Sequence, residues 1–353
     1  MANSNLLNAK RAKQDEFYTQ LVDIEKEMAA YLEYDPDVFR GKTILLPCDD
    51  PEWSNFTKYF ALRFEELGIK KLISTSFNGG GRGRIAVLDG ASGGGAIEWD
   101  YLDGNGDFRS DEVTALRDEA DMVITNPPFS LFRDFMAWLV DGGVLFSVIG
   151  NKNAITNKEI FPLIKENRLW MGKTSMSQDM LFEVPEAIKS ELMKKREGSA
   201  WRRVDGEVYA RAAACWFTNI QHGRSYEPLP LMTMEDNKRF NKRIIKNPTS
   251  YMKYDNYNAI EVPVTSGIPS DYDGVMGVPI SFLDKYCPEQ FEIVGMANRG
   301  AADPALITRV YTAGDYPNYS SLNAGPVLIK NGEPRNPYTR ILIRHIANGS
   351  PES

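Results

Sequence analysis

The sequence has 353 residues, of which 42% are hydrophobic and 25% are charged, and its formal net charge is −7. This length and composition allow one large domain or two ordinary ones and exclude a disordered, collagen-like or coiled-coil chain, while the net charge by itself argues against a nucleic-acid partner. Three widely spaced cysteines exclude a disulfide scaffold or zinc finger, and no signal peptide or membrane span is recognisable, so we expect a soluble, cytoplasmic protein.

The N-terminal part of the chain predicts helices and parallel strands in alternation. Residues 6–34 have apolar side chains at three- and four-residue spacing, which predicts a mostly helical segment. Residues 42–47 predict a buried strand, residues 57–67 a helix and residues 71–76 a second strand. This order is typical of a βαβ unit, so we expect the two strands to be parallel.

A glycine-rich stretch, residues 78–106, interrupts this alternation. It contains two extended pieces, residues 84–88 and 96–101, which predict a β-hairpin that leaves the sheet. The alternation then resumes as helix, strand, helix and strand, predicted at residues 111–119, 121–125, 131–139 and 143–149. We therefore predict a doubly wound α/β core.

Two later segments, residues 181–184 and 208–219, predict an antiparallel hairpin at the edge of this sheet. After residue 227 the chain becomes rich in Tyr, Pro and Asn and less regular. We place a boundary near residue 225, with one domain over residues 1–225 and a smaller region over residues 226–353.

The most informative motif is Asn126-Pro127-Pro128-Phe129, which begins where a predicted strand ends. Ligands of open α/β sheets bind outside the carboxyl ends of the strands. The Asn126 side-chain oxygen and a proline carbonyl can accept both hydrogens of a conjugated amine and make its nitrogen more nucleophilic as charge develops. The prolines fix the backbone, and Phe129 offers a face for a flipped base. A rigid turn between strand and helix is the alternative interpretation.

This motif resembles the catalytic motif of amino-group methyltransferases that use S-adenosylmethionine (SAM). More of the chain is similar to EcoRI-type adenine-specific DNA methyltransferases, namely residues 12–20, 43–56, 106–112, 121–135, 150–164 and 274–286. The resemblance implies a Rossmann-like SAM-binding catalytic domain over residues 1–225 and a target-recognition region over residues 226–353. It implies methylation of adenine N6 in a specific double-stranded DNA sequence by base flipping. The family contains both restriction-modification and orphan methyltransferases, and both types stay open here. No metal is implied, and any cognate restriction endonuclease would be a genetic rather than a physical partner.

The resemblance also implies roles for individual residues. The catalytic set is Asn126, Pro127, Pro128 and Phe129. The cofactor-binding set is Tyr18, Thr19, Pro47, Asp49, Asp50, Ser54, Asn55, Asp107, Phe108 and Asn126. Trp216 and Phe217 resemble the position that stacks on the other side of the target adenine.

Some of these residues have a structural alternative. Ser54 and Asn55 can each be an ordinary helix cap. Trp216 and Phe217 can each be a core aromatic, and only one of the two is expected to face the pocket because neighbours on a strand face opposite ways. The loop at Leu46–Pro51 also lacks the glycines usual in this family, so the sequence does not define which of its atoms contact the cofactor.

Positive charge is concentrated in residues 189–246, which carry 13 Lys and Arg but only 7 Asp and Glu. A basic segment in an acidic chain can supply a local field for phosphates. The residues predicted to contact DNA are Lys194, Lys195, Arg196, Arg202, Arg203, Lys238, Arg239, Lys242 and Arg243. A solvated helix face is the alternative.

Two other functions are consistent with the same motifs. A SAM-dependent methyltransferase could act on RNA or on a protein glutamine, because the same tetrapeptide serves those chemistries. A catalytically inactive DNA-binding relative is the second alternative. The large C-terminal region and the basic segment favour a polynucleotide substrate, and the intact motif and cofactor-loop segments argue against an inactive protein.

Overall fold

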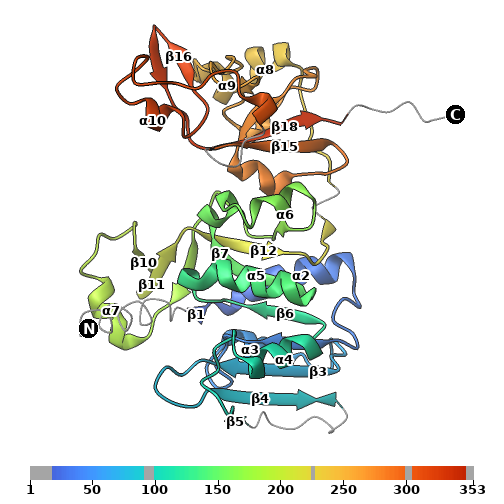
Figure 1. The fold of residues 1–353 in the computed structure, drawn as a ribbon. Coiled ribbons are helices and arrows are strands. Elements are labelled where there is room, and N and C mark those ends of the chain that lie inside the picture. Colours follow the sequence, from blue (N-terminus) through green and yellow to red (C-terminus); the bar gives the residue numbers. More distant parts are fainter. Residues whose placement is uncertain (1–17, 91–98, 224–226, 299–303, 347–353) are drawn as a thin grey trace, which may run out of the picture. The chain divides into compact units, whose positions relative to one another are not determined.

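The structure is a computed structural model that describes residues 18–90, 99–223, 227–298 and 304–346 (Figure 1). The chain divides into two compact units. The first consists of the described residues of Met1–Ala154 and Leu169–Gly223, and the second of those of Ile155–Arg168 and Arg224–Ser353. No helix in the described ranges is long and apolar enough to cross a membrane.

The first unit is built on an eight-stranded mixed sheet with the strand order β5-β4-β3-β2-β6-β7-β12-β8 (Figure 1). Its centre is parallel, because β3 pairs with β2, β2 with β6, and β6 with β7 in that orientation. The strands are β2 (Thr43–Leu46), β3 (Lys71–Ser76), β4 (Arg84–Asp89), β5 (Trp99–Tyr101), β6 (Met122–Thr125), β7 (Leu145–Asn151), β8 (Trp170–Met171) and β12 (Ala214–Thr218). The predicted α/β class with a large sheet is confirmed.

The helices of this unit connect and cover the parallel strands. They are α2 (Leu21–Tyr34), α3 (Asn55–Leu62), α4 (Asp111–Glu119), α5 (Phe132–Gly142) and α7 (Glu186–Leu192), with the 3-10 turn η2 (Phe129–Leu131). A second 3-10 turn, η3 (Lys152–Thr156), begins in this unit, and its last two residues belong to the second unit. Because α3 joins the parallel strands β2 and β3, the predicted βαβ unit is present. Gly143 ends α5 in the left-handed conformation, with φ of 61°, which glycine adopts without steric cost.

The N-terminal helix is shorter than predicted within the described residues. Tyr18–Thr19 form a short strand, β1, and α2 begins only at Leu21. The other part of the predicted helix, residues 6–17, lies outside the described residues. Helical periodicity alone does not show where a chain leaves a helix to pair with a strand far along the sequence, here β9 (Met180–Glu183).

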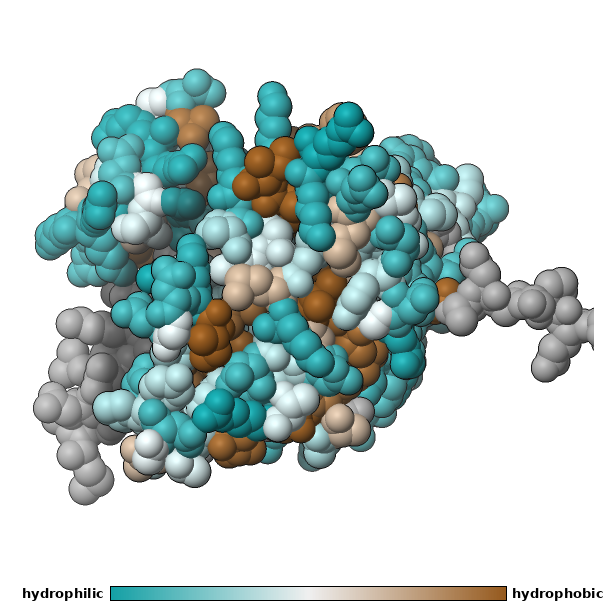
Figure 2. Space-filling view, turned by 90° about the horizontal axis from the view of Figure 1, so that it is seen from above, coloured by the Kyte–Doolittle hydropathy of each residue, from teal (hydrophilic) through white to brown (hydrophobic). Residues whose placement is uncertain are grey.

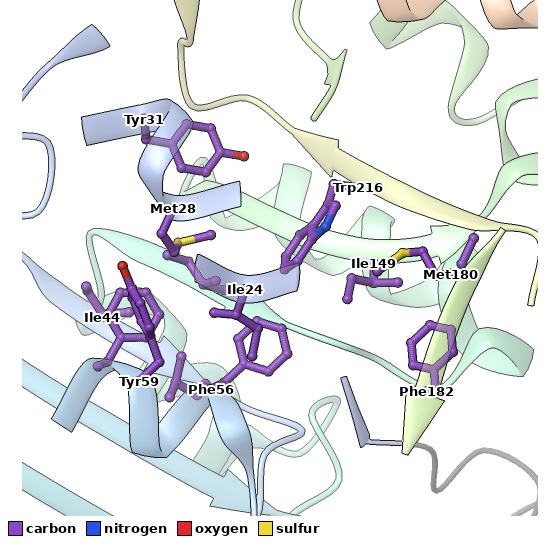
Figure 3. Close-up of a cluster of buried hydrophobic side chains, with 14 of the residues drawn as sticks. Ile24, Met28, Tyr31, Ile44, Phe56, Tyr59, Ile149, Met180, Phe182 and Trp216 are labelled. Carbon is purple, nitrogen blue, oxygen red and sulfur yellow. The ribbon is translucent and has the colours of Figure 1, made fainter. Parts of the chain in front are cut away.

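The main core of this unit lies where α2 and α3 cover the sheet (Figure 3). Ile24, Met28 and Tyr31 repeat at helical spacing and are fully buried. Burial of each large apolar side chain contributes about 1.5–3 kcal/mol. Phe56 of α3 meets Trp216 of β12 edge to face, with 5.8 Å between ring centroids. This core holds α3 against the sheet and thereby fixes the loop that precedes it.

The predicted antiparallel pairing of residues 181–184 with the first part of residues 208–219 is present, but it does not lie at the edge of the large sheet. Residues 208–219 form two strands, β11 (Glu207–Ala212) and β12, separated by Ala213, whose carbonyl accepts a hydrogen bond from the Lys152 amide. Strand β12 joins the large sheet beside β7, whereas β11 pairs with β9 (Met180–Glu183). A separate four-stranded sheet results, with the order β1-β9-β11-β10, in which β10 is Trp201–Val204. Strand periodicity cannot distinguish one long strand from two that change sheets.

The predicted hairpin within the glycine-rich stretch also differs from expectation. Strand β4 pairs antiparallel with β3, and β5 pairs with β4. The hairpin therefore extends the large sheet at its edge instead of leaving it. Residues 96–98 of the second predicted piece lie outside the described residues.

The second unit contains a four-stranded sheet with the order β13-β14-β18-β15 and a small hairpin, β16–β17. Its strands are β13 (Ile260–Glu261), β14 (Met276–Pro279), β15 (Phe291–Ala297), β16 (Leu328–Lys330), β17 (Glu333–Arg335) and β18 (Arg340–His345). Its helices are α6 (Phe161–Lys165), α8 (Met234–Phe240), α9 (Lys242–Lys246) and α10 (Tyr319–Leu322), with the 3-10 turns η5 (Thr265–Gly267), η6 (Ile280–Lys285) and η7 (Pro304–Leu306). A buried ion pair joins Arg340 to Glu261 at 2.7 Å.

Candidate active site

Several loops meet at the carboxyl ends of the parallel strands β2, β3 and β6. Because β2 lies between β3 and β6, the segments that follow these three strands are neighbours in space. They are residues 47–54 after β2, residues 77–83 after β3 and residues 126–128 after β6. This edge is where open α/β sheets bind their ligands.

The Asn126-Pro127-Pro128-Phe129 motif directly follows Thr125, the last residue of β6. Pro127 is buried, and Asn126 and Phe129 are half-buried. The Asn126 side-chain oxygen is shielded from solvent. The Phe129 ring meets Phe182 of β9 edge to face at 6.2 Å. The motif is thus a short segment held between a buried strand end and a neighbouring sheet.

Asp49, predicted to bind the cofactor, is a buried hydrogen-bond acceptor in this structure. Its side chain is 6% exposed, and its two oxygens accept hydrogen bonds from Ser54 Oγ and Thr125 Oγ1, each at 2.6 Å. Burial raises the pKa of Asp49 to about 7, although both hydroxyl hydrogen bonds act in the opposite direction. Thr125, which donates to this carboxylate and directly precedes Asn126, was not singled out from the sequence.

Ser54 and Asn55 hold the start of α3. Ser54 is the N-cap, and its Oγ accepts a hydrogen bond from the Phe56 amide at 3.0 Å, as the helix-cap interpretation predicts. The Asn55 side chain donates to the Thr19 carbonyl at 2.8 Å and so ties β1, which contains Tyr18 and Thr19, to this helix. Thr19 Oγ1 is buried and has no hydrogen-bond partner among the described residues.

Pro47 and Asp50 complete the loop after β2. Pro47 is buried, and its carbonyl accepts a hydrogen bond from Thr75 Oγ1 at 3.2 Å. Asp50 is partly exposed and lies 3.4 Å from Arg84 Nη1, which also pairs with Glu52 at 3.0 Å. This loop lacks the usual glycines, and hydrogen bonds and ion pairs to the neighbouring strands fix its conformation.

Asp107 and Phe108 lie in the loop before α4 and have different surroundings. Asp107 forms a two-pronged ion pair with Arg109, with Nη2 to Oδ2 at 2.7 Å and Nε to Oδ1 at 3.0 Å, which lowers the pKa of the carboxyl. Phe108 is only 4% exposed and packs edge to face against Phe135 at 4.9 Å. Phe108 is thus a core ring, whereas Asp107 is accessible. Arg109 was another residue missed from the sequence.

Two glycines bring this loop against the end of β3. Gly106 has a φ of 79°, and a Cβ at this position would collide with the Ser76 carbonyl oxygen. A Cβ on Gly83 would lie 2.9 Å from Gly106 Cα. The two glycines therefore allow two backbones to approach closely, and they place Asp107 beside the carboxyl end of β3.

Trp216 and Phe217 are core residues in this structure, which corrects their predicted placement at the target base. Both are 0% exposed. As expected for neighbours on a strand, they face opposite sides of the sheet: Trp216 meets Phe56, and Phe217 meets Phe132 with 5.0 Å between centroids. Neither ring presents an exposed face on which a base could stack.

The nine basic residues predicted to contact DNA are all exposed and fall into two groups. One group lies in the first unit, after α7 and on β10, and the other lies in the second unit on α8 and α9. Within the described ranges none of the nine forms an ion pair, and Lys238 Nζ lies 5.6 Å from the centroid of the Tyr251 ring. Figure 2 shows that hydrophilic side chains cover most of the face seen there, with isolated apolar groups between them.

The described residues contain no group of three or more His, Cys, Asp and Glu side chains that could hold a metal ion.

The raised pKa of Asp49 predicts a pH dependence of stability. The folded state binds this proton more tightly than the unfolded chain, whose Asp has a pKa near 3.8. The associated stability is fully present below about pH 4 and is lost as the pH rises to about 7. We expect the free energy of unfolding of the wild type, minus that of Asp49→Asn, to fall over this interval and then stay level.

Urea unfolding at a series of pH values between 4 and 8 measures this difference. Asp103→Asn, which removes a carboxylate from a fully exposed side chain, is the control. A level difference for Asp49→Asn over this interval would contradict the raised pKa.

Comparison with known proteins gives consistent matches over nearly the whole chain. The profile of a family described as "Adenine-specific methyltransferase EcoRI" matches residues 5–346. The Type II methyltransferase M.EcoRI of Escherichia coli is 40% identical over 306 residues, which cover 83% of this chain and 89% of that protein. The Type II methyltransferase M.MpnI of Mycoplasma pneumoniae is 35% identical over 346 residues, which cover 96% of this chain and 98% of that protein. No solved structure matches the chain.

Proposed function

This chain belongs to the family of adenine-specific methyltransferases of the EcoRI type, and from that premise we propose that it transfers a methyl group from SAM to adenine N6 within a specific sequence of double-stranded DNA. The observation that carries this proposal is the position of Asn126-Pro127-Pro128-Phe129 at the carboxyl end of β6, beside the loop that follows β2. In this arrangement a cofactor segment and an amine-binding segment are neighbours at one edge of a sheet.

The residues around this edge are compatible with SAM. The buried Thr19 Oγ1, which has no hydrogen-bond partner in the described part of the chain, can bind a polar group of the methionine end, and the neighbouring N-terminus of α3 favours its carboxylate. Asp107 is accessible and follows Gly106, whose backbone contacts the end of β3. Its carboxylate can therefore accept a hydrogen bond from the amine of the cofactor's adenine. We place Tyr18, Thr19, Asp50, Asn55 and Asp107 in this site. The sheet that carries them would then be a Rossmann-like methyltransferase sheet.

The chemistry requires an electrophile and an activated amine. SAM supplies a methyl group on a positively charged sulfur. Asn126 and the Pro127 carbonyl accept the two hydrogens of the adenine amine and stabilise the positive charge that develops on its nitrogen. The extra proton then leaves to solvent, and no metal ion takes part in this scheme.

The target adenine has to leave the duplex to reach Asn126. Phe129, the last residue of the motif, is half-buried and is the ring on which we place the flipped base. Trp216 and Phe217 are left out of this role because both are fully buried. The second unit, with its own sheet and exposed basic helices, is our candidate for target recognition.

The exposed basic residues should bind phosphates without reading bases. We expect replacement of Lys242 and Arg243 by alanine to weaken specific and non-specific DNA binding about equally. The slope of log affinity against log salt should flatten by about 0.9 for each phosphate that the variant no longer neutralises. Titration of both DNAs at several salt concentrations measures this effect. The exposed pair Lys158 and Arg168, replaced in the same way, is the control. An unchanged slope for the first variant would remove α9 from the DNA-binding surface.

Methyl transfer from labelled SAM to duplex DNA, RNA and protein tests the proposed function. We expect label in DNA at adenine N6 and none in RNA or in protein glutamine. Sequencing the genomic DNA of an expressing cell for N6-methyladenine would give the recognised sequence at the same time. Label in RNA or protein alone would overturn the proposal. Binding of DNA without transfer of label would instead indicate an inactive relative.

A further inference from the structure

A buried chain of side chains connects the proposed cofactor segment to the proposed catalytic motif. Ser54, which caps α3, donates to one oxygen of Asp49, and Thr125 donates to the other, each at 2.6 Å. Thr125 is bonded through its own peptide to Asn126. Ser54, Asp49 and Thr125 are all almost completely buried. The carboxylate therefore bridges two segments that meet different substrates.

The main chain of Asp49 is fixed as firmly as its side chain. Its amide donates to the Thr75 carbonyl at 2.9 Å, and its carbonyl accepts from Ser74 Oγ at 2.6 Å. Ser74 Oγ in turn lies 2.8 Å from Thr57 Oγ1 in the first turn of α3. Asp49 is thus held by β3 and α3. Its hydrogen bond to Thr125 therefore fixes the end of β6 relative to these two elements.

We propose that Asp49 is a positioning residue, which sets the place of Asn126 relative to the cofactor segment through its hydrogen bonds to Thr125 and Ser54. The inference rests on the proposed function, because it assigns Asn126 to the adenine amine. Asp49 itself touches neither substrate in this scheme.

The geometry explains why a carboxylate stands at this point. A carboxylate presents two acceptor oxygens on a rigid plane and can receive two hydroxyl groups from different elements at once. An apolar residue would fill the same space but would not form the two hydrogen bonds that fix the end of β6 relative to the start of α3. Because misplacement of a reacting group by about 1 Å can slow a reaction about 100-fold, a link of this kind can act on the rate without touching a substrate.

Removal of the Thr125 hydroxyl tests the link at the catalytic side. In Thr125→Val we expect the single-turnover rate of methyl transfer to fall by about 10- to 100-fold, while the Kd values for SAM and DNA change by less than about threefold. Thr125→Ser keeps the hydroxyl and should restore the rate to within about threefold of the wild type. If Thr125 only supported the fold, its loss would not lower the rate while leaving both Kd values unchanged. The valine and serine variants would then also have similar rates.

The matched control is Thr218→Val. Thr218 is another fully buried threonine of the same sheet. Its hydroxyl donates to the Phe146 carbonyl at 2.9 Å and accepts from the Ile220 amide at 3.0 Å. Its loss removes buried hydrogen bonds away from Asp49, so the rate should stay near that of the wild type. Thermal unfolding of all variants shows whether each is folded at the assay temperature.

A double-mutant cycle decides whether Thr125 acts through Asp49. If it does, the rate of Asp49→Asn combined with Thr125→Val should be close to that of the slower single variant, instead of showing the product of the two effects. Three results would overturn the role of Asp49: a wild-type rate in Thr125→Val, equal losses in Thr125→Val and Thr125→Ser, or independent effects in the cycle. Absence of methyl transfer by the wild type would overturn the proposed function, which is a separate outcome.

Discussion

In Asn126→Ala we expect methyl transfer to fall by a factor of about 100 to 1000, the usual consequence of losing an acceptor or donor that acts on charge in the transition state. The affinity for SAM should change by less than about tenfold, since the proposed function assigns Asn126 mainly to the adenine amine as its nitrogen becomes positive. Single-turnover transfer of labelled methyl to duplex DNA measures the first quantity, and calorimetry with SAM measures the second.

Asn126→Asp is the matched variant for this experiment. An aspartate oxygen can accept the same hydrogens, so this variant should keep more activity than Asn126→Ala. The negative charge would also attract the sulfonium group before reaction, which should tighten SAM binding. Retention of more than a tenth of the wild-type single-turnover rate by Asn126→Ala would show that the amine is activated elsewhere.

In Asp107→Ala we expect SAM binding to weaken by about 1–3 kcal/mol, the usual cost when a buried donor loses its acceptor. This corresponds to a factor of about 5 to 150 in Kd. The structure gives a specific reason to expect a strong acceptor, since Asp107 is an ionised and partly exposed carboxylate whose pKa the neighbouring Arg109 lowers. Calorimetric titration with SAM measures the effect.

Arg109→Ala provides the control for this prediction. It removes the ion pair at 2.7 Å but leaves the Asp107 carboxylate in place. If Asp107 binds the cofactor directly, Arg109→Ala should weaken SAM binding much less than Asp107→Ala does. Equal losses in the two variants would mean that the ion pair, by holding the loop before α4, is what SAM binding requires. Unchanged affinity in both would make Asp107 an ordinary loop carboxylate.

Local patterns were sufficient for the central elements of the sheet. Residues 71–76 and 111–119 form the strand and the helix that were predicted with those limits, because their apolar spacing and their terminal residues are local signals. Pairings over long distances were not predictable in the same way. The division of residues 208–219 between two sheets depends on partners in β7 and β9, which no short window of sequence contains.

By itself, the sequence determined the α/β class, the parallel β2-α3-β3 unit and the position of Asn126 directly after a buried strand, because each depends on residues close together in the chain. Only the tertiary structure decided the roles of residues whose partners are distant. Asp49 became a buried acceptor because Thr125, 76 positions away, reaches its carboxylate. Trp216 and Phe217 became core residues because α3 and α5 cover both faces of β12. Burial depends on what packs against a side chain, and that is a property of the fold as a whole.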